Sequence, residues 1–114
     1  MTKTESQFRE WAKKEYPKAV IKKIPDFKQV GCSGAVGLPD YVIFHKGKTI
    51  WFEVKSGFGD TLNLKTHLTD WQRIVFSQVF QTGVEVNIYC FTKTKGRHII
   101  SYRDLLIYGK IKFK

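Results

Sequence analysis

Apolar residues recur at helical spacing in two segments of the chain, residues 5–17 and 69–83. The first segment has an apolar stripe formed by Phe8, Trp11, Ala12 and Tyr16. The second has one formed by Trp71, Val75 and Val79. We expect the first helix to have Thr4 as its N-cap and to stop at Pro17, and the second to end at Gly83.

Strand-like apolar runs fill much of the remaining chain. They are residues 19–24, 40–46, 49–55, 84–92 and 98–102. The second and third runs flank the turn Gly47-Lys48 and predict a hairpin. Loops are expected at 25–39 and 56–67, a short helical turn at 103–109 and a basic tail at 110–114. The order α-β-β-β-α-β-β predicts an α/β or α+β fold, a small mixed β-sheet flanked by helices, in a single domain over residues 1–114.

The composition indicates a folded protein that binds a polyanion. The chain has 114 residues, of which 42% are hydrophobic and 15% aromatic. Its 20 Lys and Arg against 10 Asp and Glu give a net charge of +10, which favours nucleic acid as the partner. No apolar run is long enough to span a membrane and the N-terminus has no secretory signal, so we expect a cytoplasmic protein without a membrane partner. Cys32 and Cys90 belong to no metal-binding pattern and are expected to be free thiols.

Alternation along residues 49–55 brings acidic and basic side chains together. Ile50, Phe52 and Val54 share the face that enters the core. Trp51, Glu53 and Lys55 share the opposite face. If the hairpin forms, Asp40 lies close to Glu53, so that two carboxylates and one lysine converge at one sheet edge.

Two neighbouring carboxylates in an apolar setting need a counter-charge. Burying an unpaired carboxylate is costly, and like charges repel unless something neutralises them. Carboxylate oxygens are the ligands that Mg²⁺ prefers, often with only one or two per ion. We therefore predict a divalent cation at Asp40 and Glu53, with Lys55 beside it.

These residues resemble a known nuclease motif. Pro39-Asp40 followed by Glu53-Val54-Lys55 matches the PD-(D/E)XK pattern. The order of elements, in which GLPD is followed by a strand, a turn and a second strand that carries ExK, looks like the VRR-NUC branch and the archaeal-type Holliday junction resolvases. With an acidic residue in the preceding helix, LTDWQ opening the next helix and a final YRDLL, the resemblance covers roughly residues 5–107. It implies a restriction-endonuclease-like core.

The resemblance also implies phosphodiester hydrolysis that depends on Mg²⁺, with Mn²⁺ as a substitute. The metal would be held by Asp40, Glu53 and the Val54 carbonyl, while Lys55 stabilises or orients the nucleophile. A glutamate of the first helix would complete the site. Glu5 falls within the inward stripe of that helix, although an acid in a first turn also favours the helix dipole. Glu10 falls nearly opposite the stripe, and Glu15 faces inward beside the helix end.

Gln72 has two explanations, which are compatible with each other. It fits a capping box with Thr69, in which the glutamine side chain returns to the N-cap amide. The resemblance instead gives it the role of a motif glutamine near the metal. Ser33 lies in a loop where archaeal resolvases use a serine, but its spacing to Asp40 is shorter, so it is not assigned to the site. The run GCSGAVG lacks the Lys-Ser/Thr of a nucleotide-binding P-loop and fits a DNA-contacting loop.

The predicted function is a Mg²⁺-dependent, structure-selective DNA endonuclease that cuts branched substrates such as four-way (Holliday) junctions in DNA recombination and repair. The junction preference and a homodimeric state come from the resemblance. A nonspecific or nicking nuclease of the same fold is one alternative. A non-catalytic DNA-binding module is the other, and it would not need Asp40, Glu53 and Lys55 together.

Overall fold

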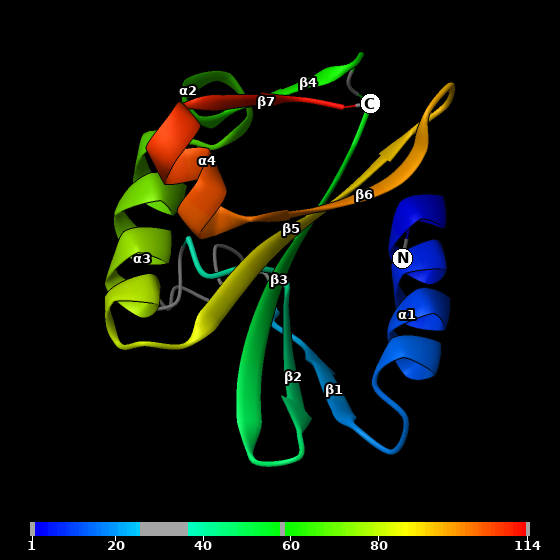
Figure 1. The fold of residues 1–114 in the computed structure, drawn as a ribbon. Coiled ribbons are helices and arrows are strands. Elements are labelled where there is room, and N and C mark those ends of the chain that lie inside the picture. The colour runs from blue at the N-terminus through cyan, green and yellow to red at the C-terminus, as the bar shows by residue number, and fades with distance from the viewer. Residues whose placement is uncertain (1, 26–36, 58, 114) are drawn as a thin grey trace.

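A computed structural model describes residues 2–25, 37–57 and 59–113 (Figure 1). The helices are α1 (Lys3–Glu15), α2 (Leu64–His67), α3 (Asp70–Gln81) and α4 (Tyr102–Tyr108). The strands are β1 (Val20–Lys23), β2 (Tyr41–His45), β3 (Lys48–Ser56), β4 (Thr61–Asn63), β5 (Glu85–Thr92), β6 (Gly96–Ser101) and β7 (Lys110–Lys112). Within the described residues no helix is long and apolar enough to cross a membrane.

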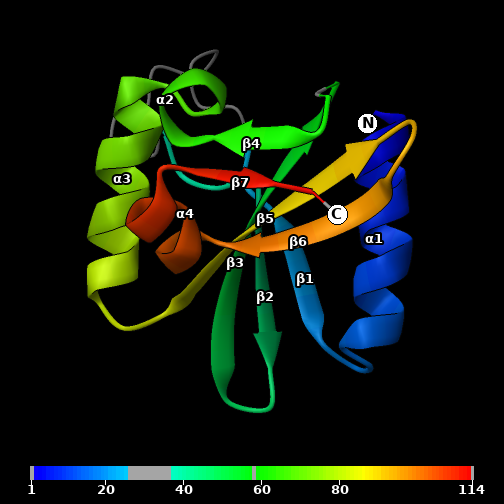
Figure 2. The same cartoon turned by 45° about the horizontal axis from the view of Figure 1, so that its top comes forward.

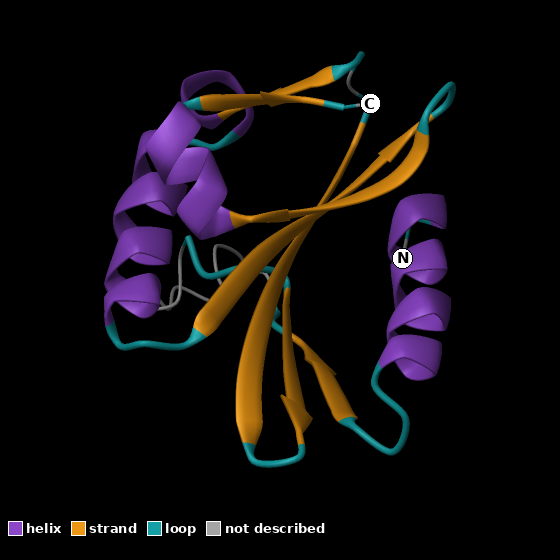
Figure 3. Ribbon diagram, in the orientation of Figure 1, coloured by secondary structure: helices purple, strands orange, loops and turns teal. Residues whose placement is uncertain are grey.

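The main sheet has five strands in the order β1-β2-β3-β5-β6 (Figure 3). Only the central pair, β3 and β5, is parallel, and the other described pairs in this sheet are antiparallel. Helix α1 covers one face of the sheet, while α3 and α4 cover the other (Figure 1). The predicted mixed sheet flanked by helices is therefore confirmed.

The two faces of β3 pack against different clusters of the core. Ile50 and Phe52 pack with α1, in a cluster whose centre is the fully buried Phe8. The Phe8 ring lies 4.8 Å from the ring of Tyr41 and 5.2 Å from those of Phe52 and Tyr89, measured between centroids. A second cluster fills the space between the sheet and helices α3 and α4. This packing fixes α1 against the strand that carries Glu53.

Two local details differ from the sequence-based expectation. The N-cap of α1 is Thr2, whose hydroxyl accepts a hydrogen bond from the backbone N–H of Glu5 (3.1 Å). Thr4 is the second residue of the helix and has no capping role. The hairpin turn is at Lys46-Gly47, one residue earlier than expected, with φ of 51° and 77°. Positive φ at both turn positions is typical of a type I′ turn.

The segments expected to be a loop (56–67) and a tail (110–114) contain further structure. Strand β4 and helix α2 lie in the first, and β7 in the second. β4 and β7 form a two-stranded antiparallel sheet, with Leu62 opposite Ile111 (Figure 2). Cys90 is a buried free thiol, as expected. Cys32, Ser33 and most of the glycine-rich run lie outside the described residues.

Candidate active site

The register of the β2–β3 hairpin brings Asp40 and Glu53 together. Tyr41 pairs with Phe52, so Asp40, one residue before β2, lies opposite Glu53. The backbone N–H of Asp40 donates a hydrogen bond to Oε1 of Glu53 (3.2 Å). In return, the N–H of Val54 donates one to Oδ2 of Asp40 (3.0 Å). Each carboxylate is thus held by the backbone of the opposite strand.

Glu53 is buried, with 3% of its surface exposed. Its second oxygen, Oε2, accepts a hydrogen bond from Nε2 of Gln72 (3.1 Å) and lies 3.2 Å from Nζ of Lys55. β3 projects Glu53 and Lys55 from the same face, as predicted, because they are two residues apart in a strand. The carboxylate is therefore oriented by β2, β3 and α3.

The electrostatic setting of the pair favours protons or cations. Burial, together with the neighbouring charge of Asp40, raises the pKa of Glu53 to about 7, despite the opposing effect of Lys55. Burial likewise raises the pKa of Asp40 above its ordinary value, although the Val54 amide and Lys55 lower it. Two carboxylates this close do not both ionise easily without a positive charge between them.

Gln72 completes the predicted capping box and also contacts Glu53. Its Oε1 accepts a hydrogen bond from the backbone N–H of Thr69 (3.0 Å), which completes the capping box of α3. Its Nε2 points the other way and donates to Glu53. Because the cap occupies the oxygen, the amide presents its donor to the carboxylate.

Glu5 lies beside this pair and is held by two residues that the sequence did not suggest. Its Oε2 accepts hydrogen bonds from Nζ of Lys23 (2.6 Å) and from the hydroxyl of Tyr41 (3.0 Å). Burial alone would raise the pKa of Glu5, but these two hydrogen bonds and the charge of Lys23 outweigh it and lower the pKa below the ordinary value. The charge of Glu5 in turn contributes to the raised pKa of Asp40. Glu10 and Glu15 are exposed.

Lys23 and Tyr41 are register partners across β1 and β2. The sequence pattern predicted both strands but paired β2 only with β3, so the contact of Lys23 with Glu5 was not predicted. Two features of the sequence could have pointed to this contact: the alternation along β1 and the aromatic residue directly after Asp40.

The donor set suits a hard divalent cation with few protein ligands. Over residues 2–25, 37–57 and 59–113, no group of three or more His, Cys, Asp or Glu side chains is placed to hold a metal. Asp40 and Glu53 provide two adjacent carboxylates, and Mg²⁺ commonly binds proteins through one or two carboxylates while keeping several waters. The residues present therefore fit Mg²⁺ better than a metal that needs a full protein cage.

Comparison with known proteins identifies the fold. No protein-family model and no curated protein matches the chain. The structure is similar to that of Hjc, a Holliday junction resolvase from the archaeal hyperthermophile Archaeoglobus fulgidus. The TM-score is 0.61, with 18% sequence identity, over 93% of this chain and 85% of that chain. At this identity the likeness shows the fold alone, and it agrees with the fold expected from the sequence resemblance.

The raised pKa of Glu53 has a consequence for stability without metal. We expect the free energy of unfolding to fall as the pH rises from 5 to 8. The unfolded chain loses the Glu53 proton near the ordinary pKa of 4.5, whereas the folded chain keeps it up to about pH 7. The folded state therefore binds more protons in this window, and the loss of stability is at most about 3 kcal/mol. Urea unfolding in EDTA at several pH values measures it.

The control is Glu53→Gln, which cannot ionise. His67, whose pKa is lowered by burial and by the charge of Lys55, acts in the opposite direction and is present in both proteins. The difference between wild type and variant therefore reports the ionisation of Glu53 together with its coupling to Asp40. The same pH dependence in both proteins would show that Glu53 ionises in the folded state as it does in the unfolded chain.

Proposed function

We propose that this protein is a divalent-metal-dependent endonuclease that hydrolyses phosphodiester bonds in branched DNA, four-way junctions among them. The buried Asp40–Glu53 pair, with Lys55 3.2 Å from Glu53, carries this proposal. The fold shared with the resolvase Hjc and the net charge of +10 support it. The proposed relationship is to the PD-(D/E)XK nucleases, in particular the VRR-NUC and archaeal resolvase branch.

Asp40, Glu53 and the Val54 carbonyl would hold Mg²⁺, or Mn²⁺ in its place. When bound, such an ion supplies Lewis-acid stabilisation of phosphate charge and makes water more acidic. The hydrogen bonds from Gln72 and the Asp40 amide keep the Glu53 carboxylate in one orientation, which reduces the reorganisation needed during reaction. Asp40 is oriented in the same way by the Val54 amide.

Lys55 and Glu5 act on the reacting groups. The ammonium group of Lys55 lies beside Glu53 and can donate a hydrogen bond to a phosphate oxygen or to the attacking water. Glu5, kept ionised by Lys23 and Tyr41, can accept a hydrogen bond from that water. Lys23 and Tyr41 are thus positioning residues for Glu5.

A small domain of this kind must recognise DNA through its shape and phosphates. We propose a homodimer, because a four-way junction offers two symmetric cleavage points and a twofold interface is the commonest way to pair identical chains. Recombination and repair are the processes that produce such junctions. A nonspecific or nicking nuclease would use the same residues without the junction preference.

The direct test is cleavage of a synthetic four-way junction and of a linear duplex of the same sequence, each with MgCl₂ in excess or with EDTA. We expect paired nicks in the junction, only with the metal. Glu53→Ala should lower the rate at least about a hundredfold, since it removes one of two carboxylate ligands. Junction binding in gel shifts should persist in this variant.

Binding without cutting in either Mg²⁺ or Mn²⁺ would favour a non-catalytic DNA-binding module. Equal cutting of both DNAs would favour the nonspecific nuclease. Loss of binding in parallel with cutting in Glu53→Ala would argue against a catalytic role for this residue.

A second test compares Glu5 with Glu15, which the helix pattern predicted to face inward but which is exposed. We expect Glu5→Gln to slow junction cleavage about tenfold or more, because the amide no longer offers two acceptor oxygens beside Asp40. Glu15→Gln, an identical change at an exposed position of the same helix, should leave the rate unchanged. Single-turnover cleavage with saturating protein measures both. Equal rates for the two variants would remove Glu5 from the site.

A further inference from the structure

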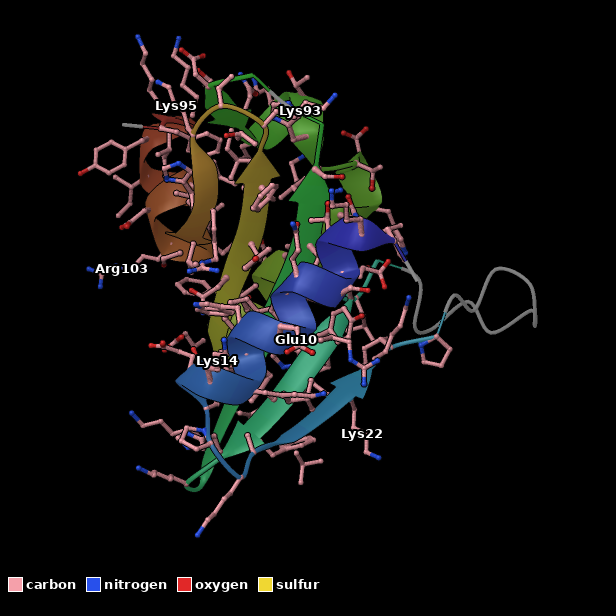
Figure 4. All side chains as sticks on the ribbon, turned by 90° about the vertical axis from the view of Figure 1, so that its right-hand side faces the viewer. Glu10, Lys14, Lys22, Lys93, Lys95 and Arg103 are labelled. Carbon is pink, nitrogen blue, oxygen red and sulfur yellow. The ribbon has the colours of Figure 1, made fainter. Side chains whose placement is uncertain are left out.

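A hollow of about 650 Å³ lies at the end of β3, on the face of the sheet that α1 covers. We call it the β3-end hollow. It is formed by the first two turns of α1, the end of β3, and the end of β5 with the turn that follows it. The residues that matter here are Lys3, Gln7, Ser56, Phe91, Lys93 and Thr94. Figure 4 shows Lys93 beyond the end of β5, on the side of the molecule that carries α1.

The charge of this hollow is positive. Lys3 and Lys93 line it, and none of the described lining residues is acidic. Both lysines are exposed, and neither has a hydrogen-bond or ion-pair partner among the residues that the structure describes. Two unengaged ammonium groups at one hollow suit a phosphate-bearing ligand.

The wall of the hollow is aromatic. Phe91 lines it and is only partly buried, next to Ser56 in the β3–β5 register. A phenyl ring beside two lysines is the combination that proteins use for single-stranded nucleic acid, with the ring stacking on a base and the cations on the backbone. A paired base in a duplex is not free to stack on such a ring.

The hollow adjoins the candidate active site through two elements. On α1, Lys3 and Glu5 share the first turn, and Glu5 is the residue held beside Asp40. On β3, Ser56 follows Glu53 by three residues, about 10 Å along the strand, and its side chain projects from the opposite face of the sheet. A DNA strand that leaves the site must therefore pass around the end of β3 to reach the hollow, which takes at least about three nucleotides at a rise of about 3.4 Å each.

A second, smaller hollow of about 360 Å³ continues along α1. It shares Lys3, Gln7 and Phe91 with the first and adds Arg97. Tyr89 also lines it, and its buried hydroxyl has no hydrogen-bond partner among the described residues. Glu10 lies at this second hollow and ends the run of positive charge.

We propose that the β3-end hollow binds an unpaired nucleotide of the DNA strand that leaves the active site, with its phosphate on Lys3 and Lys93 and its base against Phe91. This inference rests on the proposed nuclease function. It makes the preferred substrate a branched DNA with unpaired nucleotides next to the branch point.

The test compares binding of two DNAs in EDTA, a forked duplex with two unpaired arms and a blunt duplex of the same length. Fluorescence anisotropy gives the affinity at several salt concentrations. The variant is Lys3→Gln with Lys93→Gln. The matched control is Lys14→Gln with Lys48→Gln, which removes the same charge at exposed positions on the far ends of α1 and β3.

We expect the Lys3/Lys93 variant to bind the forked DNA about tenfold more weakly or worse, and its salt slope to fall by about 1.4, or 0.7 for each lost contact to a single strand. Its affinity for the blunt duplex should stay within about twofold of the control's. Equal losses on both DNAs, or a loss no larger than the control's, would overturn the proposal.

Phe91→Leu tests the stacking separately, because leucine keeps an apolar wall without an aromatic ring. We expect it to weaken forked-DNA binding about fivefold or more, with blunt-duplex binding unchanged. Unchanged forked-DNA binding would overturn the role of Phe91. The binding assay does not depend on cleavage. If the wild type never cuts DNA but the variants lose forked-DNA binding as expected, only the nuclease function is refuted. Wild type that cuts junctions while the Lys3/Lys93 variant matches its control would refute this inference alone.

Discussion

Glu53 is buried beside a second carboxylate, and the surrounding elements are arranged to hold it there. It accepts hydrogen bonds from the backbone N–H of Asp40 and from the side chain of Gln72 on α3. The ammonium group of Lys55 lies within ion-pair distance of it. Such a group is costly to bury, and a purely structural role would be served better by an apolar residue. The cost is understandable if a cation joins the pair, because the same repulsion that destabilises the empty site then strengthens metal binding.

The rest of the fold keeps this pair in place. The buried ring of Phe8 fixes α1 on the sheet, and α1 brings Glu5 to Asp40. The capping box of α3 fixes the Gln72 amide, so that a common device for starting a helix also orients a group of the site. Lys3 and Glu5 share one helical turn, so the first turn of α1 serves both the site and the neighbouring hollow.

Much of this arrangement could be predicted from local patterns. Alternation along β3 correctly separated Glu53 and Lys55 from the core residues, and the α1 stripe correctly turned Glu5 inward. The two-stranded sheet of β4 and β7 was missed, because three-residue strands have little periodicity and their pairing joins segments about fifty residues apart. Lys23 and Tyr41 were missed for a related reason, since their meeting at Glu5 depends on strand pairing that a single sequence does not specify.

The central claim is that Asp40 and Glu53 bind one divalent ion together. The most direct measurement is a crystal structure of the protein grown in MnCl₂ at pH 8, with anomalous diffraction recorded at the manganese edge. The account predicts an anomalous peak in contact with carboxylate oxygens of both residues, and its loss in crystals of Asp40→Asn. Well-ordered Asp40 and Glu53 side chains with no anomalous peak between them would contradict it.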